Sequence, residues 1–168
     1  MPETSGAEGH PALTDQQTGL PNRLHFDLVL KTLFATGRRG LPLSILILEI
    51  DGADQWLKNT EGPEAERTLR IVGATMAPTI RESDVLARAG EGRFAVCLID
   101  CNMAGAVLVA DRIDGLLDPV RESSSLGFSI GGATFDRDMG EPQDLFEAAE
   151  GALRVAQARG RNQMELRR

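Results

Sequence analysis

The chain has 168 residues, 42% of them hydrophobic and 26% charged, which is typical of one soluble globular domain with a substantial core. Its net charge of −7 argues against bulk binding to DNA, RNA or the surface of anionic membranes. No apolar run is long enough to span a bilayer, and the N-terminus does not resemble a signal peptide. Two cysteines are too few for a disulfide framework. We therefore expect a cytoplasmic protein that neither binds nucleic acid nor inserts into a membrane.

The first residues are rich in Gly, Pro, Ser and Glu, and this composition predicts a disordered lead or linker over residues 1–11. Residues 12–168 are expected to form one domain, because they contain neither an internal repeat nor a sign of a second domain. A turn that contains Gly and Pro then precedes Asn22, which is placed to cap a helix over residues 22–37.

Apolar patterns predict the next elements of the chain. Residues 43–50 form an almost unbroken apolar run, which is typical of a buried strand, and apolar residues at helical spacing then continue to about Thr79. Two further apolar strands, residues 85–87 and 94–99, are joined by residues 90–92, Gly-Glu-Gly. The two glycines of this connection can supply the positive φ angles that a narrow hairpin needs.

The C-terminal half of the chain alternates between helices and strands. Apolar spacing predicts a helix over residues 103–117, a strand over residues 126–134 and an amphipathic helix over residues 144–159. A short last strand is expected around residues 163–166. Cys97 lies inside an apolar strand and is expected to be a small core residue.

Several short motifs, in order over residues 12–166, resemble those of the GGDEF family of diguanylate cyclase domains. Residues 15–23 are similar to the family's opening Asp-x-Leu-Thr-Gly-Leu-Pro-Asn-Arg, with Gln17 in place of the Leu. Residues 88–94 are similar to the signature turn Arg-aromatic-Gly-Gly-Asp/Glu-Glu-Phe, and residues 129–131 match a Ser-x-Gly strand. The resemblance implies an α/β fold of the GGDEF or nucleotidyl-cyclase type, with a palm-like five-stranded sheet flanked by helices.

In the family, acidic side chains on the first buried strand and on the signature turn serve the Mg²⁺ that activates GTP for condensation into cyclic di-GMP. Here Glu49 stands at the first acid of the strand's Asp-x-Asp. The turn has lost both acids, because Gly92 has no side chain and Arg93 carries the wrong charge. The resemblance therefore implies an inactive member without a cofactor, with Mg²⁺ relevant only if residual GTP binding persists.

Residues that the family uses to hold the nucleotide also differ. Leu57 stands where an Asn reads the guanine, and Glu66 stands at the accompanying Asp position. Gln157 replaces a Lys that grips the triphosphate, whereas Arg161 is kept. By this likeness, the expected vestigial active site comprises Glu49, Asp51, Gly90, Glu91, Gly92, Arg93, Glu66 and Arg161.

Many members of the family carry a second site, which binds the product cyclic di-GMP, and this chain resembles them there. Arg81 and Asp84 match its Arg-x-x-Asp signature five residues before the turn, and Arg112 stands where a further Arg often joins. Arg can bind a guanine edge or a phosphate, and a carboxylate can accept from guanine N–H groups. Structural alternatives stay open: Asp84 could only shape the strand start or pair with Arg81, and Arg112 could pair with Asp111 or Asp114.

We therefore predict an inactive GGDEF domain that acts as a bacterial cyclic di-GMP receptor through Arg81, Asp84 and Arg112. The expected partners are cyclic di-GMP, a second copy in a ligand-linked homodimer, and an unidentified protein. One alternative is a pseudo-enzyme scaffold that contacts other proteins without a nucleotide. The other is an active cyclase with an unusual site around Glu49, Asp51 and Glu91.

Overall fold

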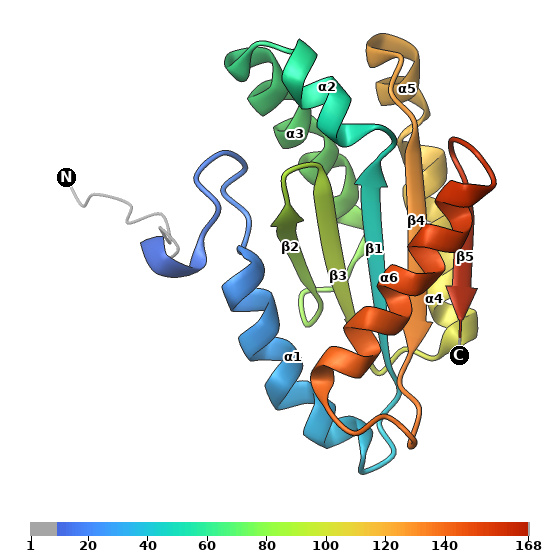
Figure 1. Cartoon of the computed structure of the whole chain (residues 1–168). Helices are drawn as coiled ribbons and strands as arrows, with labels where there is room; N and C mark the ends of the chain where they lie inside the picture. The colour runs from blue at the N-terminus through green and yellow to red at the C-terminus, as the bar shows by residue number, and fades with distance from the viewer. Residues whose placement is uncertain (1–9, 168) are drawn as a thin grey trace.

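The computed structural model describes residues 10–167, and residues 1–9 of the expected lead lie outside this range. Five strands form one mixed sheet in the order β2-β3-β1-β4-β5 (Figure 1). β1 lies at the centre and is antiparallel to both β3 and β4, whereas the edge strand β5 is parallel to β4. The strands are β1 Leu43–Ile50, β2 Val85–Gly90, β3 Arg93–Ile99, β4 Phe128–Thr134 and β5 Met164–Arg167.

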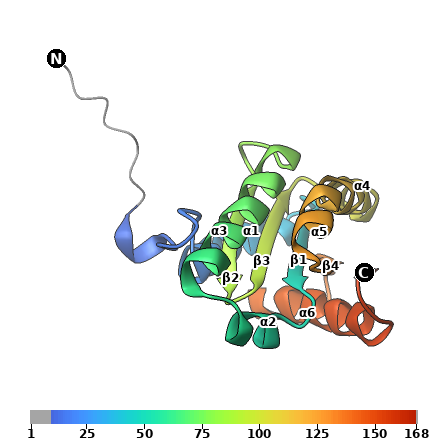
Figure 2. The same ribbon diagram turned by 90° about the horizontal axis from the view of Figure 1, so that it is seen from above.

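Helices cover both faces of this sheet, as the view from above shows (Figure 2). α1 and α6 pack on one face, and α3, α4 and α5 pack on the other. No described helix has the length and hydropathy that crossing a bilayer requires. The α-helices are α1 Arg23–Gly37, α2 Ala53–Asn59, α3 Gly62–Met76, α4 Met103–Leu116, α5 Asp118–Ser124 and α6 Pro142–Ala158, and 3-10 helices span Pro11–Leu13 and Ala77–Thr79.

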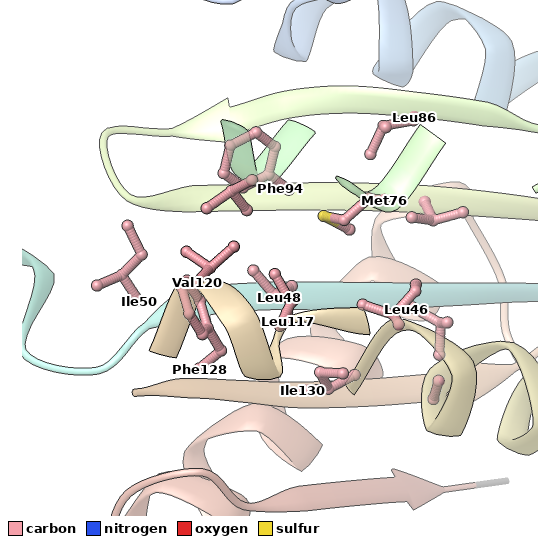
Figure 3. Packing of buried hydrophobic residues seen from close by; sticks show 14 of the residues in the cluster. Leu46, Leu48, Ile50, Met76, Leu86, Phe94, Leu117, Val120, Phe128 and Ile130 are labelled. Carbon is pink, nitrogen blue, oxygen red and sulfur yellow. The ribbon is translucent and has the colours of Figure 1, made fainter. Parts of the chain in front are cut away.

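β1 is buried on both faces because its apolar side chains alternate between two cores. Ile45 and Ile47 pack with α1 and α6. Leu46 and Leu48 point the other way, into the core beneath α3, α4 and α5 (Figure 3). Because β1 is sandwiched in this way, the polar residues at its C-terminal end are held in place from both sides.

Most element boundaries agree with the sequence-based predictions, and Asn22 caps α1 through its side-chain oxygen as expected. The predicted helix over residues 103–117 agrees with α4 to within one residue, but the short helix α5 that follows, with Pro119 in its first turn, was not predicted. The strand predicted from residue 126 begins only at Phe128, after Ser125 has turned the chain with a φ of +61°.

The connection between β2 and β3 is the predicted tight turn, but the prediction of positive φ angles at Gly90 and Gly92 was wrong. The chain reverses over Glu91 and Gly92, between the paired residues Gly90 and Arg93, and a register shift lies just before the turn, between Arg88 and Gly90. Gly92 is required for space, because a Cβ atom there would lie 2.6 Å from the Cβ of Ala53. The guanidinium of Arg88 stabilises the turn by donating hydrogen bonds to the carbonyl oxygens of Gly90 and Glu91.

Candidate functional site

A cavity of about 900 Å³ lies where the C-terminal end of β1 meets the β2–β3 turn. Antiparallel pairing of β1 with β3 places Glu49 directly opposite Arg93. The chain after β1 adds Asp51, and the end of α6 with the loop that follows it adds Gln157 and Arg161. The fold therefore gathers most of the residues of the expected vestigial active site around one cavity.

Arg93 occupies the centre of this group as an internal cation. Its guanidinium donates to Glu49 Oε2 at 2.7 Å and to Glu150 Oε2 at 3.3 Å. Gln157 Nε2 donates to the other oxygen of Glu49, Oε1, at 2.8 Å. Both carboxylate oxygens of Glu49 are thus occupied by donors from the protein itself, and the contacts join β1, β3 and α6. Sequence reasoning missed Glu150, which is separated from Arg93 by 57 residues.

Asp51 has a structural role beside this cluster. Its Oδ1 accepts from Ser129 Oγ at 2.7 Å, and its Oδ2 accepts from the backbone N–H of Asn162 at 2.8 Å. Asn162 has a φ of +56°, a conformation that Asn tolerates better than most residues. Arg161, which also lines the cavity, donates to the carbonyl oxygen of Ser125. These contacts tie the end of β1 to β4 and to the loop after α6.

The residues of the cavity do not fit a Mg²⁺ site. Mg²⁺ prefers near-octahedral oxygen ligands, with one or two carboxylates. Glu49 is engaged by two donors, Gly92 offers no side chain, and Arg93 brings a positive charge to the same place. Among residues 10–167, no group of three or more His, Cys, Asp or Glu side chains is arranged to hold a metal ion.

The charge balance of the cavity lining is negative. The carboxylates of Glu49, Asp51, Asp54 and Glu91 face only two guanidinium groups, those of Arg93 and Arg161. A polyphosphate would be repelled by this excess unless it brought its own cations.

Two residues that stand at the family's guanine-binding positions do not line this cavity. Leu57 and Glu66 are both absent from its lining. Glu66 was predicted to belong to the vestigial site, but on α3 its carboxylate pairs at 2.7 Å with Arg70 one helical turn further on. Arg70 in turn donates to the carbonyl oxygen of Gln17, so both side chains are directed toward the N-terminal motif.

A second cavity, of about 420 Å³, brings together Arg81, Asp84 and Arg112. Arg81 and Asp84 come from the loop before β2, and Arg112 comes from α4. Leu108 and Val109 of α4 supply part of the apolar wall. The Arg-x-x-Asp signature and the distant Arg112 thus line one cavity.

Asp84 shapes the start of β2, one of the alternatives that the sequence left open. Its side chain is only 2% exposed, and its two oxygens accept the backbone N–H groups of Arg81 and Ile99 at 2.9 and 3.0 Å. Arg81 is 58% exposed, donates to the Ile99 carbonyl oxygen and approaches Asp84 Oδ2 to 3.6 Å. Within the described chain, Arg112 forms no ion pair with either of the expected partners: Asp114 pairs with Arg121, and Asp111 forms no ion pair.

The two cysteines, Cys97 and Cys101, differ in their surroundings, and only Cys101 lines the second cavity. Burial, reinforced by the negative charge of Asp84, raises the pKa of the Cys97 thiol to about 12. Cys97 is fully buried, which confirms it as a core residue. Cys101 lines the cavity, and burial raises its pKa while the positive charge of Arg81 opposes the rise.

Comparison with known proteins gives a consistent likeness over almost the whole chain. The family described as "Diguanylate cyclase, GGDEF domain" matches residues 12–163. Diguanylate cyclase DosC of Escherichia coli K12 is 31% identical over 94% of this chain and 35% of its own length. Response regulator PleD of Caulobacter vibrioides is 31% identical over 90% of this chain and 35% of its own length. The chain therefore spans about a third of these curated relatives.

Solved structures share the fold. The GGDEF domain of DgcB from Caulobacter crescentus, in complex with c-di-GMP, superposes with a TM-score of 0.81 at 21% identity and covers 98% of both chains. The GGDEF domain of PA1120 from Pseudomonas aeruginosa gives 0.79 at 27% identity and covers 90% of this chain and 98% of that one. Diguanylate cyclase SiaD from the same organism, in complex with its activator SiaC, gives 0.83 at 23% identity and covers 93% and 62%.

Proposed function

Since the chain belongs to the GGDEF family, we propose that it is a catalytically inactive member that serves as a receptor for cyclic di-GMP in bacterial signalling. The observation that carries this proposal is the contrast between two cavities. In the first cavity, Arg93 beside the signature turn is bound by two carboxylates. The second cavity presents Arg81 and Arg112 beside Asp84.

Loss of activity is supported by the position of Arg93. Condensation of two GTP molecules requires divalent cations to neutralise phosphate charge and to activate a hydroxyl group. A guanidinium held about 4 Å from a divalent ion would repel it by roughly 8 kcal/mol at an effective dielectric constant of 20. Arg93 cannot relieve this repulsion without breaking its ion pairs with Glu49 and Glu150. The replacement of the Lys that grips the triphosphate by Gln157 also weakens the hold on GTP, because an amide carries no positive charge and here donates to Glu49.

The receptor role is supported by the free donors of the second cavity. Arg112 has no ion pair within residues 10–167, and most of the Arg81 side chain remains in solvent. Two guanidinium groups can bind the two phosphates of a cyclic dinucleotide or the O6/N7 edges of its guanines. Because the oxygens of Asp84 hold the loop, we assign the main ligand contacts to the two arginines and the shaping of the site to Asp84.

Calorimetric titration with cyclic di-GMP tests the receptor role. The wild type should bind with low-micromolar or tighter affinity, and Arg81→Ala should lose that binding. Arg70→Ala is a matched control, because Arg70 is 59% exposed, close to the 58% of Arg81, and lines neither cavity. Wild-type protein that does not bind at high ligand concentration would favour the alternative, a scaffold that contacts proteins without a nucleotide.

A turnover assay tests the loss of activity separately. Purified protein incubated with GTP and either Mg²⁺ or Mn²⁺ should form no cyclic di-GMP. Any sustained product would contradict the assignment of an inactive domain and favour a cyclase with an unusual site around Glu49, Asp51 and Glu91. The two assays are independent, since a receptor could bind the product whether or not it could make it.

A further inference from the structure

Asp84, the acidic residue of the Arg-x-x-Asp signature, is poorly placed to accept hydrogen bonds from a ligand. One of its carboxylate oxygens accepts the backbone N–H of Arg81, and the other accepts the backbone N–H of Ile99. Each oxygen keeps a second lone pair, but the side chain is only 2% exposed, so a base in the second cavity has almost no surface of this carboxylate to contact. A ligand with N–H groups on its base therefore needs another acceptor there, because a buried donor that stays unpaired weakens binding.

Asp100 brings a second carboxylate to the same cavity. It directly follows the last residue of β3, is exposed, and lines the cavity together with Arg81 and Arg112. Within residues 10–167, its carboxylate forms neither an ion pair nor a hydrogen bond, whereas Arg81 and Asp84 approach each other to 3.6 Å. Burial has the largest effect on the pKa of the Cys101 thiol, and the charges of Arg81, Asp84 and Asp100 also act on it. Asp100 thus lies close to the residues of the proposed ligand site and has both oxygens free.

The turn at Asp100 does not itself require a carboxylate. The residue has a φ of +50°, in the left-handed region. Gly adopts this region without a steric penalty, and Asn tolerates it at least as well as Asp. A residue without charge would therefore make the same turn, and the negative charge of Asp100 is available for contact with a ligand.

We propose that Asp100, and not Asp84, accepts hydrogen bonds from a guanine of cyclic di-GMP and makes the second cavity selective for guanine, an inference that rests on the proposed receptor function. Guanine presents the acceptors O6 and N7 on one edge and the donors N1–H and N2–H on another. A guanidinium donates to the first edge, and a carboxylate with two free oxygens accepts both donors of the second. Arg81 and Arg112 supply the first kind of group and Asp100 the second. Adenine has an acceptor at N1, which a carboxylate repels, so Asp100 would also exclude it.

Calorimetric titration of Asp100→Asn with cyclic di-GMP tests the assignment. The amide keeps the size of the side chain, but its NH₂ group would face the N–H donors of guanine, so affinity should fall by about tenfold to a hundredfold. General electrostatics predict the opposite sign, because the loss of a negative charge near an anionic ligand favours binding. Asp111→Asn is the matched control, since Asp111 is exposed beside Arg112 in the sequence and does not line the cavity. It should bind as tightly as the wild type or up to about twofold more tightly.

An analogue of the ligand tests the contact with N2. Cyclic di-IMP, in which hypoxanthine replaces guanine, keeps O6, N7 and N1–H and lacks only the N2 amino group. The wild type should bind it about tenfold more weakly than cyclic di-GMP, whereas Asp100→Asn should bind the two ligands within about threefold of each other. Equal losses for the two proteins would overturn the proposed contact with N2.

Asp100→Gly separates the role in binding from a role in folding. It removes the carboxylate and suits the φ of +50°, so its midpoint of urea unfolding should equal or exceed that of the wild type while its affinity for cyclic di-GMP falls as in Asp100→Asn. A wild type that binds cyclic di-GMP, together with Asp100 variants that bind it equally well, would overturn the assignment to Asp100 and leave the receptor function standing. A wild type that does not bind cyclic di-GMP would overturn both.

Discussion

Arg93→Ala is the change that tests the internal cation most directly. It removes the guanidinium that joins Glu49 and Glu150 and leaves these two carboxylates near each other without a shared partner. Gln157 still donates to Glu49, but a neutral amide cannot offset the repulsion. We expect the folded state to be destabilised although no apolar core is disturbed.

The magnitude follows from the geometry. Hydrogen bonds to charged groups contribute about 1.5–3 kcal/mol each when a partner would otherwise be left unpaired. The side chains of Arg93, Glu49 and Glu150 are 25%, 23% and 23% exposed, so water solvates part of the charge that the variant leaves behind. The 3.3 Å contact with Glu150 is the weaker of the two. We therefore expect Arg93→Ala to lower the free energy of unfolding by about 2 kcal/mol.

Urea unfolding at pH 7, followed by circular dichroism, measures this loss as a lower midpoint at an unchanged slope. Arg154→Ala is the control, because Arg154 contacts the same Glu150 at 4.0 Å but is 70% exposed. Its replacement should cost no more than about 0.5 kcal/mol. A double-mutant cycle of Arg93→Ala with Glu49→Gln should show a coupling of about 1 kcal/mol. If the two arginine variants unfolded at the same midpoint, the reasoning about the internal cation would be refuted.

Two further predictions concern the core. Gly131→Ala should lower the free energy of unfolding in urea by about 3 kcal/mol or more, because its Cβ would lie 2.5 Å from Leu153 Cα and 2.6 Å from the Ala149 carbonyl oxygen. The control, Gly151→Ala in the middle of α6, should instead stabilise the domain by about 0.5–1 kcal/mol. A mild effect at Gly131 would contradict the close packing of α6 on β4. Cys97, whose pKa is raised from 9.0 to about 12, should react with a thiol reagent at pH 8.5 only when the domain unfolds. The stability that the protonated thiol contributes should be complete below pH 9 and should fall as the pH rises toward 12. Rapid labelling of both cysteines in the folded state would show that Cys97 is accessible.

Local patterns in the sequence were sufficient for most of the helices and strands. β1 and the core face of α6 follow from runs and spacings of apolar residues, which depend only on the period of a strand or a helix. Asp84 shapes its loop through N–H groups only 3 and 15 residues away. The grouping of Arg81 with Arg112 was anticipated only through the family likeness, because the two residues lie on different elements and no local pattern relates them.

Contacts between segments far apart in sequence were decided by the tertiary structure alone. No pattern in the sequence indicated that Arg93 would reach Glu150 on α6, because that contact depends on how α6 crosses the sheet. The same holds for Gly92, which is needed because Ala53 of α2 lies against the turn and not because its φ is positive. Sequence reasoning placed Glu66 in the vestigial site, but a partner on its own helix holds it elsewhere. The period of each element is a local property of the chain, whereas the partner of a charged side chain depends on which surfaces pack together.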